Sequence, residues 1–151
     1  MVREFKTEDL DEIMELWLQT NISAHEFIDS SYWRENYEAV REMIPKATIY
    51  IYEVDGIIQS FVGVADGYIA GIFVSSEVQS QGIGRKLLNY CKERYSKLSL
   101  SVYKKNEGAV RFYKREGFLV TSEKIDENTN EIEYEMEWRH SFSESGGKNV
   151  R

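Results

Sequence analysis

Apolar residues recur at two different spacings along the chain, and these spacings predict alternating strands and helices. After a short strand over residues 2–5, apolar residues recur every three or four positions, as on one face of a helix: Leu10, Ile13, Met14 and Trp17. Thr7 is a suitable N-cap for this helix, because acidic residues fill the turn that follows it. A second helix is predicted to begin at Ser30 or Ser31 and to end at Pro45, the single proline of the chain.

Between Ala47 and Val74 the pattern becomes that of β-strands. This stretch is rich in β-branched and aromatic residues, and two Asp-Gly pairs divide it, at Asp55-Gly56 and Asp66-Gly67. Asp-Gly pairs favour the tight two-residue turn of a β-hairpin. We therefore expect three consecutive strands, over residues 48–54, 57–64 and 68–74.

The second half of the chain alternates between the two spacings. A helix is expected to begin near Gly82, a strand follows over residues 98–103, and Asn106 is placed to cap a further helix that ends at Gly117. A strand over residues 118–122 then pairs across a polar turn with a final strand. In that final strand apolar residues alternate with glutamates, from Glu131 and Ile132 to Glu137 and Trp138. Such alternation is typical of a strand with one buried face.

The order of these elements predicts an α/β fold, with a mixed sheet of about six or seven strands and helices on both faces. We expect one domain over residues 1–140. Residues 141–151 are rich in serine and glycine and are expected to form a flexible polar tail.

Composition agrees with a single folded domain and narrows the class of protein. The chain has 151 residues, of which 42% are hydrophobic. Its one cysteine, Cys91, allows no disulfide within a monomer and fits a reducing compartment. The charged first residues lack the apolar run of a signal peptide, and no stretch approaches the roughly 20 apolar residues of a membrane span. We expect a cytoplasmic protein, without a metal, because two histidines and one cysteine offer no ligand cluster.

Charge is distributed unevenly along the chain. The net charge of −7 argues against nucleic acid as the main partner. Residues 79–115 nevertheless carry ten Lys or Arg and only two Glu, so the rest of the chain carries a net −15. Many of these basic side chains belong to solvated helix faces. An anionic ligand at this segment would also account for them.

The same basic segment begins with a glycine loop, which joins the strand ending at Val74 to the helix beginning near Gly82. Unpaired N–H groups and the positive end of the helix dipole favour an anion there, and glycines let it approach the backbone. A P-loop is excluded because Arg85-Lys86 follows the second glycine. A dinucleotide fingerprint is excluded because Leu87 stands where its third glycine belongs. By itself the loop also fits a simple tight turn.

Two motifs at this separation resemble the GNAT superfamily of N-acetyltransferases. The first is the loop Gln79-x-x-Gly82-x-Gly84 followed by Arg85. The second is Asn106-x-x-Ala109-x-x-Phe112-Tyr113-x-x-x-Gly117-Phe118. The order of strands and helices over residues 2–139 is also similar to that superfamily. The resemblance implies the GNAT fold, in which the fourth and fifth strands splay apart, and acetyl-CoA as the cosubstrate.

The resemblance also implies which residues bind acetyl-CoA. The pyrophosphate would lie on the loop, the pantetheine arm would run beside the end of the fourth strand, and backbone N–H groups near Val74 would polarise the thioester carbonyl. The cofactor-binding residues are then Ile72, Phe73, Val74, Gln79, Ser80, Gln81, Gly82, Ile83, Gly84, Arg85, Asn106 and Tyr113. Four basic residues are candidates for the 3′-phosphate: Arg85, Lys86, Lys104 and Lys105.

Acetyl transfer to an amine needs a proton donor for the leaving thiolate and a route for the proton of the amine. Asn106 and Tyr113 lie seven residues apart, which places them on one face of a helix. In the superfamily the tyrosine at the position of Tyr113 is the general acid, and a tyrosine remains protonated at neutral pH. The alternative is that Tyr113 only packs. Candidates for the base are Asp66, His25 and Glu26. The usual pKa of a histidine lies nearest to neutral pH, which favours His25.

The segment around His25 also carries the resemblance to a subgroup. Residues His25-Glu26-Phe27-Ile28 and Tyr32-Trp33-Arg34 are similar to the small bacterial YiaC/YjaB-type acetyltransferases. That likeness implies protein or peptide lysine as the acceptor, although other amines are also permitted. His25, Phe27, Tyr32 and Trp33 are then candidates for the acceptor wall, and several of them could instead be core residues.

Two other readings remain open from sequence alone. The first is a non-catalytic acyl-CoA sensor on the same fold, which would keep the glycine loop but would not need Tyr113. The second is an enzyme that uses a longer acyl chain. A monomer and a homodimer are both compatible with the sequence, and no membrane partner is expected.

Overall fold

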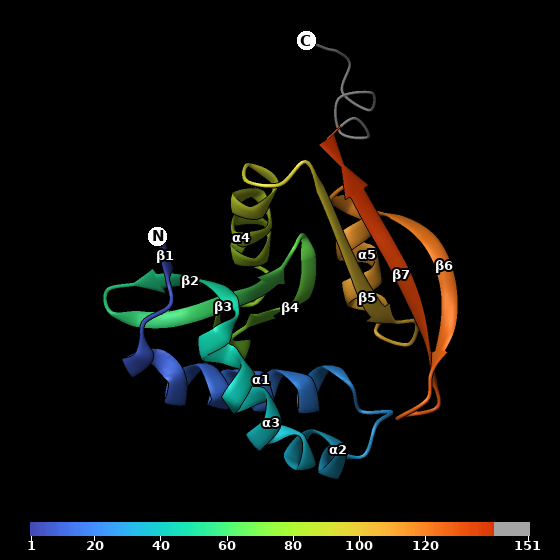
Figure 1. Ribbon diagram of the computed structural model, residues 1–151, viewed down its shortest axis with the longest axis horizontal. Coiled ribbons are helices and arrows are strands. Elements are labelled where there is room, and N and C mark those ends of the chain that lie inside the picture. The colour runs from blue at the N-terminus through green and yellow to red at the C-terminus, as the bar shows by residue number, and fades with distance from the viewer. Residues whose placement is uncertain (141–151) are drawn as a thin grey trace.

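A computed structural model describes residues 1–140 and contains one seven-stranded sheet with the order β1-β2-β3-β4-β5-β7-β6 (Figure 1). All neighbouring strands are antiparallel except β4 and β5, which are parallel. The strands are β1 (Val2–Glu4), β2 (Thr48–Val54), β3 (Ile57–Ala65), β4 (Tyr68–Val74), β5 (Lys97–Tyr103), β6 (Leu119–Asp126) and β7 (Glu131–Arg139). The expected mixed sheet is confirmed, and the predicted tail lies outside the described residues.

Five helices cover the two faces of this sheet, and a hydrophobic cluster lies under each group (Figure 1). Helices α1 (Leu10–Ala24), α2 (Ser30–Glu35) and α3 (Tyr37–Met43) share one face. Helices α4 (Ile83–Lys92) and α5 (Glu107–Arg115) share the other. No helix within residues 1–140 is long and apolar enough to cross a membrane.

The sheet opens between β4 and β5. These strands pair only at Tyr68 with Ser99 and at Ile69 with Leu100. Directly after Ile69 the pairing of β4 with β3 shifts by one residue, which marks a β-bulge. A bulge bends its strand, so β4 turns away from β5 at this point. On its other side β5 pairs with β7 along its whole length, from Lys97 to Tyr103, and the opening is therefore confined to one joint of the sheet.

Turn and cap residues in the sequence predicted most of the helices and strands correctly. Both Asp-Gly turns have positive φ at both residues, 52° and 78° at Asp55-Gly56 and 51° and 79° at Asp66-Gly67. Such values are those of the type I′ hairpin turn. Asn106 Oδ1 accepts the Ala109 N–H at 3.3 Å, which confirms the predicted cap of α5. Strand β6 extends to Asp126, four residues beyond the prediction, because it pairs with β7 up to the polar turn.

The prediction of one helix from residue 30 to Pro45 was wrong. The segment forms α2, a break at Asn36, α3 and a short 3-10 turn (Ile44–Lys46) that contains Pro45. The Asn36 side-chain amide donates to the Tyr32 carbonyl at 2.7 Å. Such side-chain hydrogen bonds to the backbone compete with a continuous helix.

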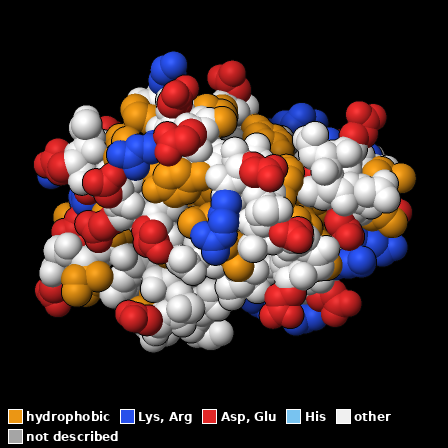
Figure 2. Space-filling view, turned by 90° about the horizontal axis from the view of Figure 1, so that it is seen from below, with side chains coloured by type: hydrophobic (Ala, Val, Ile, Leu, Met, Phe, Trp, Pro, Cys, Tyr) orange, Lys and Arg blue, Asp and Glu red, His pale blue; other side chains and the backbone are white. Residues whose placement is uncertain are grey.

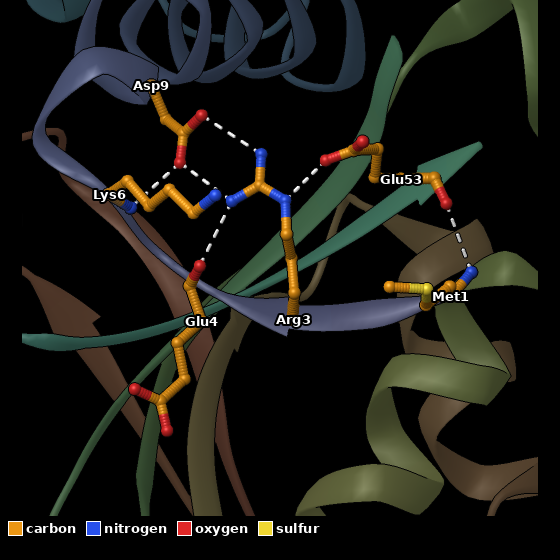
Figure 3. A network of polar contacts seen from close by, with 6 residues as sticks. All are labelled: Met1, Arg3, Glu4, Lys6, Asp9 and Glu53. Atoms are coloured by element: carbon orange, nitrogen blue, oxygen red, sulfur yellow. Dashed lines mark hydrogen bonds and ion pairs between the residues drawn. The ribbon is translucent and has the colours of Figure 1, made fainter. Parts of the chain in front are cut away.

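Thr7 was also misassigned as an N-cap. Residues Thr7–Asp9 form a 3-10 turn, and α1 begins at Leu10. The polar group that fixes this end of α1 is Asp9, whose carboxylate accepts the Lys6 N–H at 2.8 Å and two guanidinium bonds from Arg3 at 2.9 and 3.0 Å (Figure 3). Arg3 also binds Glu53 on β2. Asp9 is buried, and its bonds to Arg3 lower the pKa of its carboxyl group.

Candidate active site

A cavity of about 790 Å³ lies where β4 separates from β5, and it reaches residues on both faces of the sheet. Its size is that of a pocket for a sizeable small molecule. Four segments line it: the C-terminal part of α1, the end of β4, the glycine loop with the start of α4, and α5. The lining residues used below are Asn21, His25, Ile72, Phe73, Val74, Gln79, Ser80, Gly82, Ile83, Gly84, Arg85, Asn106, Phe112, Tyr113, Arg115 and Glu116.

The glycine loop presents the N-terminus of α4 to this cavity. Ser80 and Gly82 both have left-handed backbone conformations, with φ of 70° and 80°. The Gln79 side chain donates to the Val74 carbonyl at 3.1 Å and ties the loop to the end of β4. The first backbone hydrogen bond of the helix runs from the Lys86 N–H to the Gly82 carbonyl, so the N–H groups before Lys86 have no partner within the helix. These groups and the helix dipole favour an anion.

Glycine at position 84 lets α4 approach its neighbours closely. A Cβ atom built there would lie 3.5 Å from Phe112 Cζ and 3.7 Å from Val74 Cγ2, so a larger side chain would enter the space between α4, α5 and β4. Position 82 differs, because a Cβ there would meet nothing within 4 Å. Gly82 is required for its positive φ, which L-residues seldom adopt.

Helix α5 brings Asn106 and Tyr113 to the same cavity, as their spacing predicts. Tyr113 is 8% exposed, and its ring packs edge-on against Phe112 and Phe118, with ring centroids 5.2 and 5.5 Å away. Burial raises the pKa of the Tyr113 hydroxyl above its usual value. Tyr113 therefore remains protonated at neutral pH and can donate a proton.

His25 faces Tyr113's helix from the opposite wall of the cavity, at the C-terminal end of α1. Its Nδ1 lies 3.0 Å from the Asn21 carbonyl, and its Nε2 lies 3.3 Å from the Asn106 side-chain nitrogen. The ring stacks on Trp33 with a centroid distance of 5.1 Å and an interplanar angle of 28°. Burial lowers the pKa of His25. The structure thus joins two predicted site residues, His25 and Asn106, that are 81 positions apart.

The predicted acceptor residues Phe27, Tyr32 and Trp33 are not among the residues that line the cavity; Phe27 and Trp33 contact His25, and Tyr32 packs on Trp33. Trp33 is buried, and its ring packs edge-on against Tyr32 at 4.9 Å. The ring of Phe27 contacts His25 at 5.7 Å. These side chains therefore form the support behind His25, which agrees with the alternative that several of them belong to the core.

Two residues that the sequence analysis did not single out complete this support. Tyr103, at the end of β5, contacts the His25 ring at 5.3 Å and the Phe27 ring at 5.8 Å. Its hydroxyl donates to Asp126 Oδ2 at 2.6 Å. Asp126 comes from the end of β6, and only strand pairing brings that end to α2. No local motif marks Asp126.

Glu26 is not among the residues that line the cavity, and Asp66, the last candidate for the base, lies elsewhere. It occupies the turn before β4, whereas the cavity is lined by the other end of that strand, at residues 72–74. Asp66 is not among the residues that line the cavity. The structure therefore does not bring Asp66 together with Tyr113 and His25.

The basic candidates for a phosphate also separate in space. Arg85 lines the cavity, with a side chain 68% exposed and 3.4 Å from Glu116. Arg115, which the sequence analysis counted only among the basic residues, lines it as well. The other three candidates make contacts outside the cavity: Lys86 with Tyr52, Lys104 with Tyr134 and Lys105 with Glu131.

Comparisons with known proteins agree with this arrangement. Residues 18–138 match the family model described as Acetyltransferase (GNAT) domain. The peptidyl-lysine N-acetyltransferase YiaC of Escherichia coli is 34% identical over 140 residues, which are 91% of this chain and 96% of that protein. The solution structure of apo YjaB from E. coli has a TM-score of 0.82 at 23% identity, covering 91% of this chain and 96% of that one. A yncA acetyltransferase structure from Salmonella typhimurium with acetyl-CoA has a TM-score of 0.63 at 16% identity, covering 92% of each chain.

Proposed function

Because the chain belongs to the GNAT acetyltransferase family, we propose that it transfers the acetyl group of acetyl-CoA to the ε-amino group of lysine in a protein or peptide. The observation that carries this proposal is the cavity at the opening of β4 and β5. One wall of it offers an anion site and the other reaches the opposite face of the sheet, so a donor and an acceptor can meet at the end of β4.

The residues of the first wall fit acetyl-CoA. Its pyrophosphate would be held by the N–H groups at the start of α4, and its 3′-phosphate by Arg85 or Arg115. Beyond Ile69, β4 has no partner on the β5 side, which leaves backbone groups of residues 72–74 available to the amides of a pantetheine arm. Acetyl-CoA supplies a thioester, whose acyl group is activated toward an amine.

Tyr113 is the proton donor in this proposal. When the amine attacks the thioester, the carbon–sulfur bond breaks and the thiolate takes a proton from the Tyr113 hydroxyl. Burial raises the pKa of this hydroxyl group, which keeps it neutral near pH 7. Tyr113 lines the cavity from α5.

The proposal of lysine as acceptor rests on the likeness to YiaC and on charge. The free ε-amine of lysine is cationic near neutral pH and would be attracted to carboxylates. Asp126 provides one behind His25, bound to Tyr103. Acidic side chains are also spread over the face that carries α1–α3, as Figure 2 shows.

The test is release of free thiol from acetyl-CoA with a panel of acceptors, namely lysine peptides, polyamines, aminoglycosides and free amino acids. We expect turnover to be fastest with lysine peptides and to require a free ε-amine. Tight binding of acetyl-CoA without turnover on any amine would instead identify a sensor. Absence of acetyl-CoA binding would refute the proposal, and faster turnover with a longer acyl-CoA would correct the donor.

A further inference from the structure

We infer that His25 is a positioning residue that holds the Asn106 side chain in place across the cavity, rather than the base that deprotonates the acceptor. This inference rests on the proposed function of the cavity. It assigns one protonation state to the His25 ring and one orientation to the Asn106 amide, two side chains that are 81 positions apart.

The hydrogen bonds around His25 can be satisfied in only one way. A carbonyl oxygen only accepts hydrogen bonds, so His25 Nδ1, 3.0 Å from the Asn21 carbonyl, must carry a proton. In the neutral ring Nε2 is then an acceptor. It receives the N–H of the Asn106 amide at 3.3 Å.

The other half of the Asn106 amide fixes its orientation independently. Asn106 Oδ1 accepts the Ala109 N–H at 3.3 Å and so caps α5. The nitrogen of the amide must therefore point toward His25. Rotating the amide by half a turn would place an N–H group against the Ala109 N–H and would remove the cap.

Protonation of His25 would break this array. An imidazolium presents N–H groups at both nitrogens, so Nε2 would face the Asn106 N–H as donor against donor. For the same reason the lone pair of Nε2 is already occupied and is not free to take a proton from an amine. His25 thus links the end of α1 to the start of α5, and through the cap it holds the helix that carries Tyr113.

The surroundings of His25 favour the neutral ring. Trp33 of α2 stacks on it, and Phe27 and Tyr103 contact its edges. Charged groups lie behind these rings, with Lys105 over Phe27 and Asp126 beyond Tyr103, while Arg85, Arg115 and Glu116 line other parts of the cavity. Burial, rather than any of these charges, is the main cause that lowers the pKa of His25.

The first experiment reads the tautomer directly. Long-range ¹H–¹⁵N NMR of the full-length protein distinguishes a protonated Nδ1 from a protonated Nε2, and the chain has only two histidines, so a His140→Gln variant assigns the spectrum. We expect His25 to carry its proton on Nδ1 and to become charged only below the usual pH range of a histidine, because burial lowers its pKa. A proton on Nε2, or a titration of His25 in the usual range of a histidine, would overturn the inference.

The second experiment separates positioning from base catalysis. In His25→Gln the side-chain oxygen can replace Nε2 as acceptor, whereas His25→Asn is too short to do so and can replace only the Nδ1 donor. We expect His25→Gln to keep acetyl-CoA affinity and turnover within about twofold, and His25→Asn and His25→Ala to weaken acetyl-CoA binding about fivefold, the worth of one hydrogen bond. In an Asn106→Ala background, His25→Ala should add little further loss.

A base would give a different pattern. Loss of about 100-fold or more in turnover by His25→Gln, with unchanged acetyl-CoA affinity, would identify His25 as the base and refute the inference. Independent, additive effects of His25→Ala and Asn106→Ala would refute it as well. Failure of the wild-type protein to bind acetyl-CoA would instead refute the proposed function, and the tautomer measurement would still decide whether the array exists.

Discussion

The two walls of the cavity are built in opposite ways. The wall formed by the glycine loop and α5 comes from two short stretches of sequence, and at the start of α4 it offers backbone N–H groups that have no partner within the helix. We refer to it as the backbone wall. The wall at the end of α1 is made of side chains, and His25 there depends on Trp33, Tyr103 and Asn106 from three other segments.

This difference follows from what each wall has to recognise. A phosphate is an anion that a helix N-terminus binds without any particular side chain, so the first wall needs glycines and a correct turn. The wall at the end of α1 orients the Asn106 amide, and a hydrogen bond of fixed direction requires particular side chains. Substitutions on the first wall should therefore change binding through the backbone conformation or the net charge. Substitutions on the second wall should change it through the loss of particular side-chain contacts.

The largest effect is expected from Tyr113→Phe, which removes the proton donor and leaves the ring in place. We expect turnover to fall about 100-fold or more, because general acid catalysis typically contributes that much, with the Kd of acetyl-CoA unchanged. Steady-state kinetics and calorimetric titration measure the two quantities. Tyr95→Phe serves as the control, since Tyr95 packs against the same core without lining the cavity. Equal turnover in both variants would remove Tyr113 from the chemistry.

Gly82→Ala, on the backbone wall, is expected to raise the Kd of acetyl-CoA about tenfold. Gly82 has a φ of 80° with open space around a Cβ, so the added methyl group acts only through backbone strain of about 1–2 kcal/mol, which corresponds to roughly tenfold in binding. Gly56→Ala is a matched control, because Gly56 has a φ of 78°, equally open space and a position in a hairpin turn.

Both glycine variants should lose similar amounts of thermal stability, measured by calorimetry, while only Gly82→Ala should weaken acetyl-CoA. If Gly56→Ala weakened acetyl-CoA to the same degree, the effect of Gly82→Ala would reflect stability rather than the loop.

A smaller effect, about threefold to tenfold in the Kd of acetyl-CoA, is expected from Arg115→Gln, since one charged contact to a phosphate is lost. The effect should shrink at high salt and should disappear when acetyl-CoA lacks its 3′-phosphate. Lys104→Gln is the control, because Lys104 contacts Tyr134 outside the cavity. A loss that is independent of the 3′-phosphate would place Arg115 elsewhere along the cosubstrate.

Asp9→Asn, at the far end of α1, is expected to leave the affinity for acetyl-CoA unchanged. The free energy of unfolding should fall by about 2 kcal/mol, because charged hydrogen bonds to Arg3 are weakened. The pKa of Asp9 is lowered in the folded state, so its contribution is present at neutral pH and is lost as the pH falls below about 4 and through that lowered pKa. Urea unfolding at pH 7 and pH 3 measures this difference. A change in acetyl-CoA affinity would show that the two ends of α1 are coupled.

The backbone wall could be predicted from sequence because each of its features is encoded within a few residues. Gly82 acts through its own φ value, and the Asn106 cap acts through a neighbour three positions away. The same holds for the two Asp-Gly turns. The errors lay where side-chain bonds altered a helix end, as at Asn36 and Asp9, because such bonds depend on partners that spacing does not show.

The basic segment shows the limit of a count of charges. Its residues predicted an anion site. Of the basic residues discussed, only Arg85 and Arg115 line the cavity. Lys104 and Lys105 do not, because the chain after β5 turns these two side chains toward β7. Asp66 does not line the cavity, because the strand that follows it lines the cavity with its other end.

Local backbone preferences and periodicity produce three features: the sheet with its helices, the glycine loop, and the helix that carries Asn106 and Tyr113. These features could therefore be predicted from the sequence alone. The role of His25, in contrast, depends on the folded chain. Its partner Asn106 is 81 residues away, and the two meet at the cavity where β4 separates from β5. A hydrogen bond has direction as well as distance, and that direction is fixed by packing.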